Sequence, residues 1–108
     1  MNQLEYESAD NILRVALPGC FDYTLRARFI LIQDKLDQFD TIILDFSNVT
    51  YIDSTGICIL LYIREKATKK EHIHITNVSQ RIYNILTVAG CHLLFQITAP
   101  SEIGAKAS

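Results

Sequence analysis

The segment Thr41–Gly56, with the sequence TIILDFSNVTYIDSTG, carries the strongest structural signals in this chain of 108 residues. Its beginning, Thr41–Phe46, is a short and nearly continuous apolar run, which is typical of a strand covered on both faces. We therefore expect this run to be the central strand of a sheet. A loop over Ser47–Asp53 follows, and Ser54 has a side chain well suited to the N-cap of the next helix.

Upstream of this segment, the residue patterns predict a hairpin and one helix. Apolar and polar residues alternate over Leu4–Ser8, and a second strand-like run covers Asn11–Leu17. Apolar residues then recur at spacings of three and four over Thr24–Gln38, which predicts an amphipathic helix that packs on the sheet.

Downstream, the patterns predict two more helices with a strand between them. We expect a helix over Thr55–Lys70, a strand over His72–Thr76, and a third helix that is capped by Asn77–Ser79 and ends at Gly90. The final apolar stretch, Leu93–Ile97, fits either a strand or a helix. Because helices alternate with strands, the order favours parallel pairing with right-handed crossovers, and hence an α/β fold.

The composition describes a globular chain and argues against several functions. Apolar residues make up 49% and charged residues 20%, so we expect one domain over residues 1–100 and a frayed tail over 101–108. A net charge of −2 argues against direct binding of nucleic acid, which depends on a dense basic surface. No secretory signal is visible, and the longest apolar run, Ile57–Ile63, has seven residues where a bilayer needs about 20. Three cysteines without a Cys-x-x-Cys spacing suit a reducing compartment, so we expect a cytoplasmic protein without membrane insertion.

The predicted helix Thr55–Lys70 is unusual because Ile57–Ile63 is apolar around two full turns rather than along one stripe. A helix that is apolar all round needs burial on more than one side. One side faces the sheet. The other side either packs against a neighbouring helix or presents an apolar patch to a partner beside Ser54.

Ser54 lies where a phosphorylation switch would be expected. It follows the carboxyl end of a strand, where binding sites gather in open α/β sheets. The unpaired N–H groups and the positive dipole end of a helix start also tolerate a phosphate, which would add about −1.5 to −2 charges. We expect Gly56 to leave room for a kinase and Asp53 to repel the phosphate, so that a partner docked over the loop is expelled. The alternative is that Ser54 is a helix cap with no other role.

No complete catalytic or metal-binding constellation accompanies Ser54. Ile52 stands where a Gly-x-Ser-x-Gly nucleophile elbow needs its first glycine, which argues against a serine hydrolase. His72 and His74 would share a strand face but lack a third metal ligand, and the side chains of Cys91-His92, as neighbours at a turn, are expected to diverge. Four glycines without Walker or Rossmann spacing form no phosphate-binding loop. We therefore expect a substrate of phosphoryl transfer and not an enzyme, with no cofactor and no metal.

The stretch Ile43–Gly56 closely resembles the signature of bacterial STAS domains, the anti-sigma factor antagonists. The similarity continues at Pro18–Asp22, which resembles the family's Gly-x-x-Asp turn, and at Asn77–Ser79 and Leu86–Phe95, so it covers nearly the whole chain. It implies a single STAS-like α/β domain, with a four- to five-stranded mixed sheet and helices mostly on one face. The chain departs from the family pattern at Cys58, where a small residue, frequently glycine, is common.

The resemblance also implies that Ser54 is the phosphoacceptor. An unphosphorylated domain of this type binds a partner serine kinase, the anti-sigma factor, which then releases what it held; a phosphatase resets the phosphorylated domain. Asp22 matches an acidic position of the family near the phosphoacceptor. The residues expected to contact the kinase partner are Asp22, Asp53, Thr55, Gly56, Ile57 and Ile59.

Two other roles remain open for such a domain. STAS-like domains also serve as accessory subunits of membrane transporters, including lipid-asymmetry ABC systems, where the same helix and loop would dock on an ATPase without phosphorylation. The third role is that of a subunit in a larger signalling scaffold held by homotypic packing. The sequence leaves open the partner and the oligomeric state, a homo-oligomer included. It also leaves open whether the output is regulation of transcription, biofilm-type signalling or transport.

Overall fold

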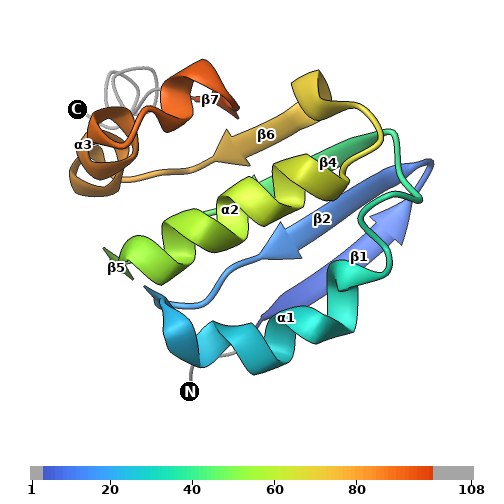
Figure 1. The fold of residues 1–108 in the computed structure, drawn as a ribbon, viewed down its shortest axis with the longest axis horizontal. Helices are drawn as coiled ribbons and strands as arrows, with labels where there is room; N and C mark the ends of the chain where they lie inside the picture. The colour runs from blue at the N-terminus through green and yellow to red at the C-terminus, as the bar shows by residue number, and fades with distance from the viewer. Residues whose placement is uncertain (1–3, 99–108) are drawn as a thin grey trace.

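The computed structural model describes residues 4–98, apart from the side chains of residues 23, 26–28 and 31 (Figure 1). The main sheet has five strands in the order β1-β2-β4-β6-β7. These strands are Glu5–Ala9 (β1), Ile12–Ala16 (β2), Thr41–Asp45 (β4), Ile73–Thr76 (β6) and Gln96–Ile97 (β7). β1 runs antiparallel to β2, and all other neighbours are parallel. The expected hairpin, the mixed sheet and the central place of β4 are therefore confirmed.

Helices and a second, smaller sheet complete the described part of the chain. The α-helices are Arg26–Gln33 (α1), Ser54–Lys66 (α2) and Gln80–Val88 (α3), and 3-10 turns cover Tyr23–Leu25, Lys70–His72 and Cys91–Leu93. Cys20–Phe21 (β3) and Tyr51–Ile52 (β5) form a parallel pair of their own. This pair was not predicted, because strands of two residues are too short to show alternation.

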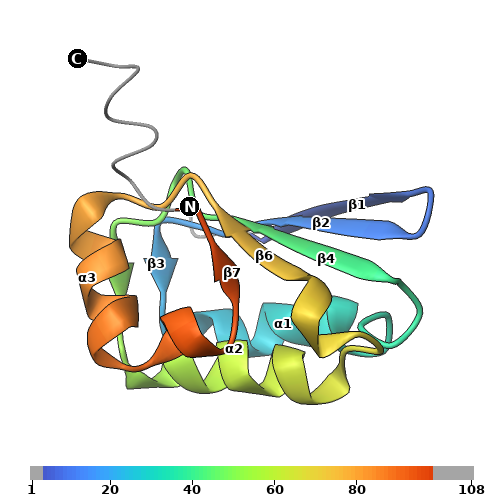
Figure 2. The same cartoon turned by 90° about the horizontal axis from the view of Figure 1, so that it is seen from above.

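The strand order explains why the helices cover only one face of the sheet. From β2 onward, each new parallel strand is added on the same side of the previous one. Because crossovers between parallel strands are right-handed, steps in one direction place the connecting helices on one face. Figure 2 shows α1 and α2 side by side on that face, with α3 at one end of the molecule. The prediction of helices mostly on one face is confirmed.

The one-sided cover is visible in the burial of the central strand. In β4, Ile42 and Leu44 are 1% and 0% exposed, whereas Thr41, Ile43 and Asp45 are half-buried and face away from the helices. β2 and β6 alternate in the same way. The prediction that this strand is covered on both faces is therefore wrong. Its apolar run consists of one buried face and a single isoleucine on the other.

α1 ends at Gln33 and not at Gln38 as predicted. Tighter turns follow, in which the amide of Lys35 donates to the carbonyl of Ile32 at 2.9 Å. Leu36 is nevertheless fully buried. Turns of three residues keep apolar side chains on the same face as a helix does, so the spacing alone did not mark where the α-helix stops.

α2 likewise ends at Lys66, before the predicted Lys70. Lys70 lies in the next 3-10 turn, but its Nζ donates to the carbonyls of Arg64 and Glu65 at 3.1 and 3.0 Å. The last carbonyls of an α-helix have no intrahelical partner. Lys70 therefore stabilises the end of α2 from outside the helix.

The C-terminal part of the prediction is mostly confirmed. Ser79 caps α3, since its Oγ accepts from the amide of Ile82 at 3.3 Å, and Gly90 follows with a left-handed φ of 84°. The ambiguous stretch Leu93–Ile97 contains the end of a 3-10 turn and the edge strand β7. The predicted tail, residues 101–108, lies outside the described residues. Among residues 4–98, no helix has both the length and the apolar character that crossing a bilayer requires.

Two adjacent leucines on α2 test this one-sided burial, because Leu60 is 0% exposed and Leu61 is 43% exposed. We expect Leu60→Ala to lower the free energy of unfolding by about 2–5 kcal/mol, since it leaves a cavity. Leu61→Ala should lower it by less than about 1 kcal/mol. Chemical denaturation followed by circular dichroism measures both, and equal losses would contradict the assignment of Leu61 to the surface.

Candidate functional site

Two acidic residues come together at the carboxyl ends of the small sheet. β3 and β5 pair in parallel with Phe21 opposite Ile52, so the next residues, Asp22 and Asp53, leave the two strands side by side. The amide of Asp53 donates to the carbonyl of Phe21 at 3.4 Å, which extends the pairing by one bond. Both acidic residues are half-buried. The structure thus places side by side the two acidic residues that the sequence singled out from distant positions.

The N-cap of α2 is Asp53 and not Ser54. Asp53 has an extended backbone, with φ −121° and ψ −171°, and its Oδ1 accepts from the amide of Gly56 at 3.1 Å. The prediction is wrong by one residue because Asp and Ser are equally good caps. The bond from Asp53 to Phe21 of β3 decides between them, since it holds the backbone of Asp53 in the extended form that a cap requires.

Ser54 is therefore the first residue inside the helix, and its side chain is exposed. Its hydroxyl makes no hydrogen bond to any other residue within the described range 4–98. The amides of Ser54 and Thr55 lie in the first turn, where N–H groups have no intrahelical partner and the helix dipole is positive. The site thus presents an uncommitted hydroxyl at the positive end of a helix whose first turn starts beside two acidic residues, Asp53 and Asp22.

Asp22 shapes the turn that leads into α1. Its Oδ1 accepts from the amide of Thr24 at 3.0 Å and from the hydroxyl of Thr24 at 2.6 Å. Its carbonyl accepts from the amide of Leu25 at 3.0 Å. These bonds fix the carboxylate at the end of β3. Asp22 thus has a structural role of its own, and its expected contact with the kinase partner stays a prediction.

Gly56 is buried and allows the start of α2 to approach β3. A Cβ at this position would lie 2.3 Å from the carbonyl oxygen of Phe21 and 2.8 Å from Cγ1 of Ile52. Both distances are shorter than any normal contact, so only glycine fits. Gly56 is therefore required for close packing below the surface, and its expected role of leaving room for a kinase stays a prediction.

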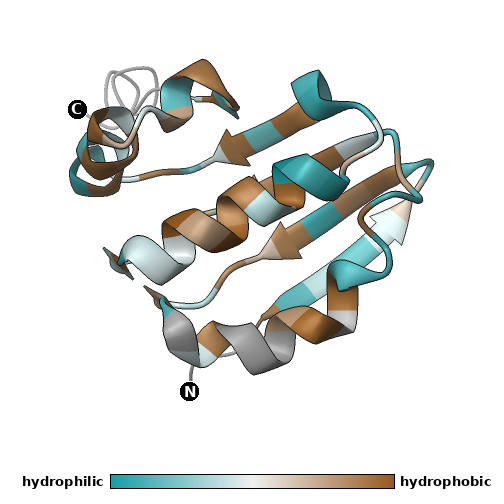
Figure 3. Cartoon of the chain, viewed as in Figure 1, coloured by the Kyte–Doolittle hydropathy of each residue, from teal (hydrophilic) through white to brown (hydrophobic). Residues whose placement is uncertain are grey.

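The two isoleucines that were expected to contact a partner are not exposed. Ile59 is 6% exposed and belongs to the core, and Ile57 is half-buried against it. Thr55 is also half-buried. The large exposed apolar side chains of α2 are instead Leu61 and Tyr62, at 43% and 38%. Figure 3 shows that the middle of this helix is hydrophobic and its C-terminal end hydrophilic.

A groove of 450 Å³ lies between α1 and α2 and begins one turn after Ser54. It is lined by Phe29, Ile30, Gln33, Cys58, Ile59 and Tyr62. The rings of Phe29 and Tyr62 meet edge to face with their centroids 5.7 Å apart. Both alternatives for the apolar excess of α2 are thus partly right, because the helix packs against α1 and an apolar strip stays open beside it.

The histidines and Cys91 do not join this site. His72 lies in the 3-10 turn before β6 and not in the strand, and His74 lies within β6. Over residues 4–98, no group of three or more His, Cys, Asp or Glu side chains is placed to hold a metal ion. Cys91 is buried, and burial raises the pKa of its thiol, which disfavours the reactive thiolate, while His92 is exposed.

Sequence reasoning missed one polar cluster at the carboxyl edge of the main sheet. Oδ1 of Asp45 accepts from the amide of Ser47 at 2.9 Å and from Nδ2 of Asn77 at 3.1 Å. Burial raises the pKa of Asp45, but these bonds, the Ser47 hydroxyl and the charge of Arg14 together lower it below its ordinary value. The Asp-x-Ser pattern could have signalled the local turn, whereas nothing in the sequence pairs Asp45 with Asn77.

Comparisons with known proteins agree with this architecture. A sequence model of one family, the STAS domain, matches residues 3–102. An anti-sigma factor antagonist from Mycobacterium paratuberculosis has a similar structure, with a TM-score of 0.77 and 17% identity over 100% of this chain and 96% of the other. The Bacillus cell fate determinant SpoIIAA in its phosphorylated form gives 0.60 and 18% over 98% and 100%. A sulfate transporter family protein from Wolinella succinogenes gives 0.64 and 23% over 78% and 70%. Among curated proteins, none matches the sequence.

A pair of glycines tests the close packing at the site. We expect Gly56→Ala to lower the free energy of unfolding by about 1–3 kcal/mol, because the strain exceeds the roughly 1 kcal/mol that alanine contributes to a helix. Gly19→Ala is the control, since its Cβ would lie 3.5 Å from the nearest atom, the carbonyl oxygen of Asn48, which is an ordinary contact. Thermal denaturation measures both variants. A stable Gly56→Ala protein would refute the close approach of α2 to β3.

Proposed function

This chain belongs to the STAS domain family, and we propose that it acts as an anti-sigma factor antagonist or a similar partner-switching regulator. In its unphosphorylated form it binds a serine kinase of the anti-sigma type. Phosphorylation of Ser54 by that kinase releases it, and a phosphatase restores the binding form. In this role the chain is a cytoplasmic substrate of phosphoryl transfer and not an enzyme, and it needs neither a cofactor nor direct contact with nucleic acid.

The observation that carries this proposal is the uncommitted hydroxyl of Ser54 at the start of α2. Because Asp53 supplies the cap, a phosphate on Ser54 removes no hydrogen bond that holds the helix. The side chain is exposed, so a kinase reaches it without unfolding the domain. The capping role and the chemical role therefore belong to two neighbouring residues and do not interfere.

A phosphate on Ser54 changes the charge of the surface rather than the fold. It adds about −1.5 to −2 charges beside the carboxylates of Asp53 and Asp22, while the positive end of α2 partly offsets the repulsion. Solvent and salt screen charges at an exposed site, so the helix start persists. A partner packed closely over Ser54 would instead have to desolvate a dianion, which strongly opposes binding.

The proposed partner surface continues from Ser54 along α2. Cys58, Leu61 and Tyr62 follow Ser54 by about one and two helical turns, so they lie on the same side of the helix. All three are exposed, and the groove toward α1 adds the side chain of Ile30. One partner can therefore cover both the switch residue and this apolar strip, with Ile59 supporting the strip from the core.

The structural comparisons support this proposal at the level of the fold. SpoIIAA, which has a similar fold, was solved in a phosphorylated form, and the Mycobacterium protein is an anti-sigma factor antagonist. At 17% and 18% identity the similarity carries the fold alone. The role of this chain therefore rests on Ser54 and its surroundings.

A second candidate function is that of an accessory subunit of a membrane transporter. The observation that favours it is the fold shared with the sulfate transporter family protein from Wolinella succinogenes. In this role the same apolar strip along α2 docks on the transporter's ATPase, including that of a lipid-asymmetry ABC system, and Ser54 stays unmodified. Binding to such an ATPase that is equal for wild type and Ser54→Asp would favour this second candidate.

Variants of Ser54 test the switch directly. After incubation with ATP and the candidate kinase, intact mass spectrometry should show one added phosphate on the wild type and none on Ser54→Ala. Ser54→Ala should still bind the kinase, and Ser54→Asp should bind it about tenfold more weakly, although a carboxylate carries less charge than a phosphate. Thr55→Ala is the control and should still gain one phosphate. A phosphate on Ser54→Ala, or equal affinities of wild type and Ser54→Asp, would contradict the switch.

Two exposed apolar residues test the partner surface. Ile30 is 58% exposed and lines the groove, whereas Leu93 is 78% exposed in a 3-10 turn on the other side of α2 (Figure 1). We expect Ile30→Ala to weaken kinase binding by about tenfold, because burial of an aliphatic side chain contributes about 1.5–3 kcal/mol. Leu93→Ala should leave the affinity unchanged. Isothermal titration calorimetry measures the affinity of both variants for the kinase. Weaker binding by Leu93→Ala together with unchanged binding by Ile30→Ala would place the partner on the other side of α2.

A further inference from the structure

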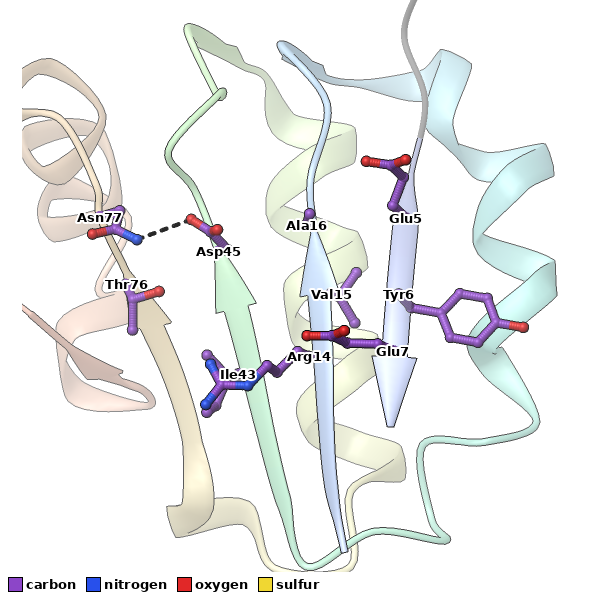
Figure 4. A pocket seen from close by; sticks show the side chains of 10 residues that line it. All are labelled: Glu5, Tyr6, Glu7, Arg14, Val15, Ala16, Ile43, Asp45, Thr76 and Asn77. Carbon is purple, nitrogen blue, oxygen red and sulfur yellow. Dashed lines mark hydrogen bonds between the residues drawn. The ribbon is translucent and has the colours of Figure 1, made fainter. Parts of the chain in front are cut away.

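Asp45 stands where three loops meet at the carboxyl edge of the main sheet. It is the last residue of β4, the middle strand. Its side chain lies on the helix-free face, in a hollow of 460 Å³ that Arg14, Thr76 and Asn77 also line (Figure 4). The loops that follow β2, β4 and β6 are all bonded to Asp45 or to the residue after it.

The carboxylate of Asp45 joins two of these loops. Its Oδ1 accepts from the amide of Ser47 at 2.9 Å and from Nδ2 of Asn77 at 3.1 Å, and Figure 4 shows the second bond. Ser47 begins the segment that leads through β5 to Ser54. Asn77 begins the loop that leads to Ser79, the N-cap of α3. A single carboxylate thus ties the switch segment to the start of α3.

Main-chain bonds tie the third loop to the same point. The carbonyl of Asp45 accepts from the amide of Leu17 at 3.1 Å, where the chain leaves β2 for β3 and Asp22. The amide of Phe46 donates to the carbonyl of Thr76 at 2.9 Å. The segment that leads to Asp22 and the segment that leads to Ser54 are therefore both bonded to Asp45 where they begin.

The side-chain bonds of Asp45 are of the stronger kind. The pKa of Asp45 is lowered overall, since burial raises it but the bonds from Ser47 and Asn77 and the charge of Arg14 outweigh burial, so the carboxylate is ionised at neutral pH. Hydrogen bonds to an ionised acceptor are about twice as strong as neutral ones. Asn77 also holds a left-handed backbone with φ 59°, which is uncommon for a residue other than glycine. The conformation of this loop directs the Asn77 amide to Asp45.

We propose that Asp45 is a positioning residue for the switch, because it fixes the start of the 46–53 segment and thereby sets where Ser54 stands relative to Asp22 and the kinase. The proposal rests on the proposed function of Ser54. It adds a residue at the other end of the 46–53 segment from Ser54. Phe46 and Val49 anchor the same segment in the core, at 1% and 3% exposure. Loss of the Asp45 carboxylate should therefore loosen the segment without unfolding the domain.

Three variants separate positioning from folding. Asp45→Ala removes both side-chain bonds. Asn77→Gly removes only the bond to Asn77 and keeps a backbone that adopts left-handed φ freely, so it provides the test if Asp45→Ala does not fold. Asn11→Gly is the matched control, because Asn11 also has a left-handed φ, of 65°, but lies in the turn between β1 and β2 at the opposite end of these strands.

Amide hydrogen exchange, measured by NMR on the free protein, gives the first result and needs no partner. The amides of Ser47, Val49 and Thr50 are bonded to Asp45, Phe46 and Gly19. They should exchange about tenfold faster in Asp45→Ala and about threefold faster in Asn77→Gly, and at the wild-type rate in Asn11→Gly. Wild-type exchange of these amides in a folded Asp45→Ala protein, or in Asn77→Gly, would overturn the proposal.

Phosphorylation of Ser54 by the partner kinase gives the second result. A displaced hydroxyl lowers kcat, whereas the docking strip on α2 is intact, so we expect kcat to fall about tenfold in Asp45→Ala while KM stays within about twofold. Faster exchange with an unchanged kcat would make Asp45 a purely structural residue and overturn the proposal. No phosphorylation of the wild type would instead refute the proposed function, and the exchange rates would still decide whether Asp45 holds the segment.

Discussion

The whole architecture depends on one constraint, the right-handed crossover applied repeatedly in one direction. Each parallel strand after β2 is added on the same side of the one before it, so the connecting helices have only one face of the sheet to cover. The carboxyl ends of β2, β4 and β6 consequently lie along one edge, and the loops that follow them gather there. The segment that leads to Asp22 follows β2 and the segment that leads to Ser54 follows β4, and this edge is what brings the two segments together.

The same constraint determines how closely the first turn of α2 packs against β3. The chain leaves β4, forms the short strand β5 against β3, and turns into the helix directly over Phe21. Because α2 packs back onto the sheet on the only covered face, its first turn presses against the backbone of β3, where a Cβ on residue 56 would meet the carbonyl oxygen of Phe21 at 2.3 Å. The glycine of the motif is therefore required by packing, although it stands beside the residue proposed to carry the chemistry.

Local sequence patterns predicted the features that depend on neighbouring residues. They failed for the features that depend on contacts between residues far apart in the sequence. The hairpin, the cap of α3 at Ser79 and the stop at Gly90 depend on neighbouring residues and were predicted correctly. The exact cap of α2 depends on the bond from Asp53 to β3, and the bare face of β4 depends on where the other helices lie, so neither was visible in the sequence. The candidate site around residues 53–56 stays a prediction, and the burial of Ile59 and the link from Asp45 to Asn77 needed the fold.

The place of the cap also limits how a phosphate on Ser54 could act. If Ser54 were the cap, its esterification would disturb the bond that starts the helix, and the signal would spread as local unfolding. With Asp53 as the cap, the amide of Gly56 is already satisfied, and the covalent change falls on a side chain that holds nothing in place. A switch built this way works by the charge and bulk that it shows to a partner. Its response then depends on how accurately the 46–53 segment places Ser54, which is the task that the geometry around Asp45 is suited to perform.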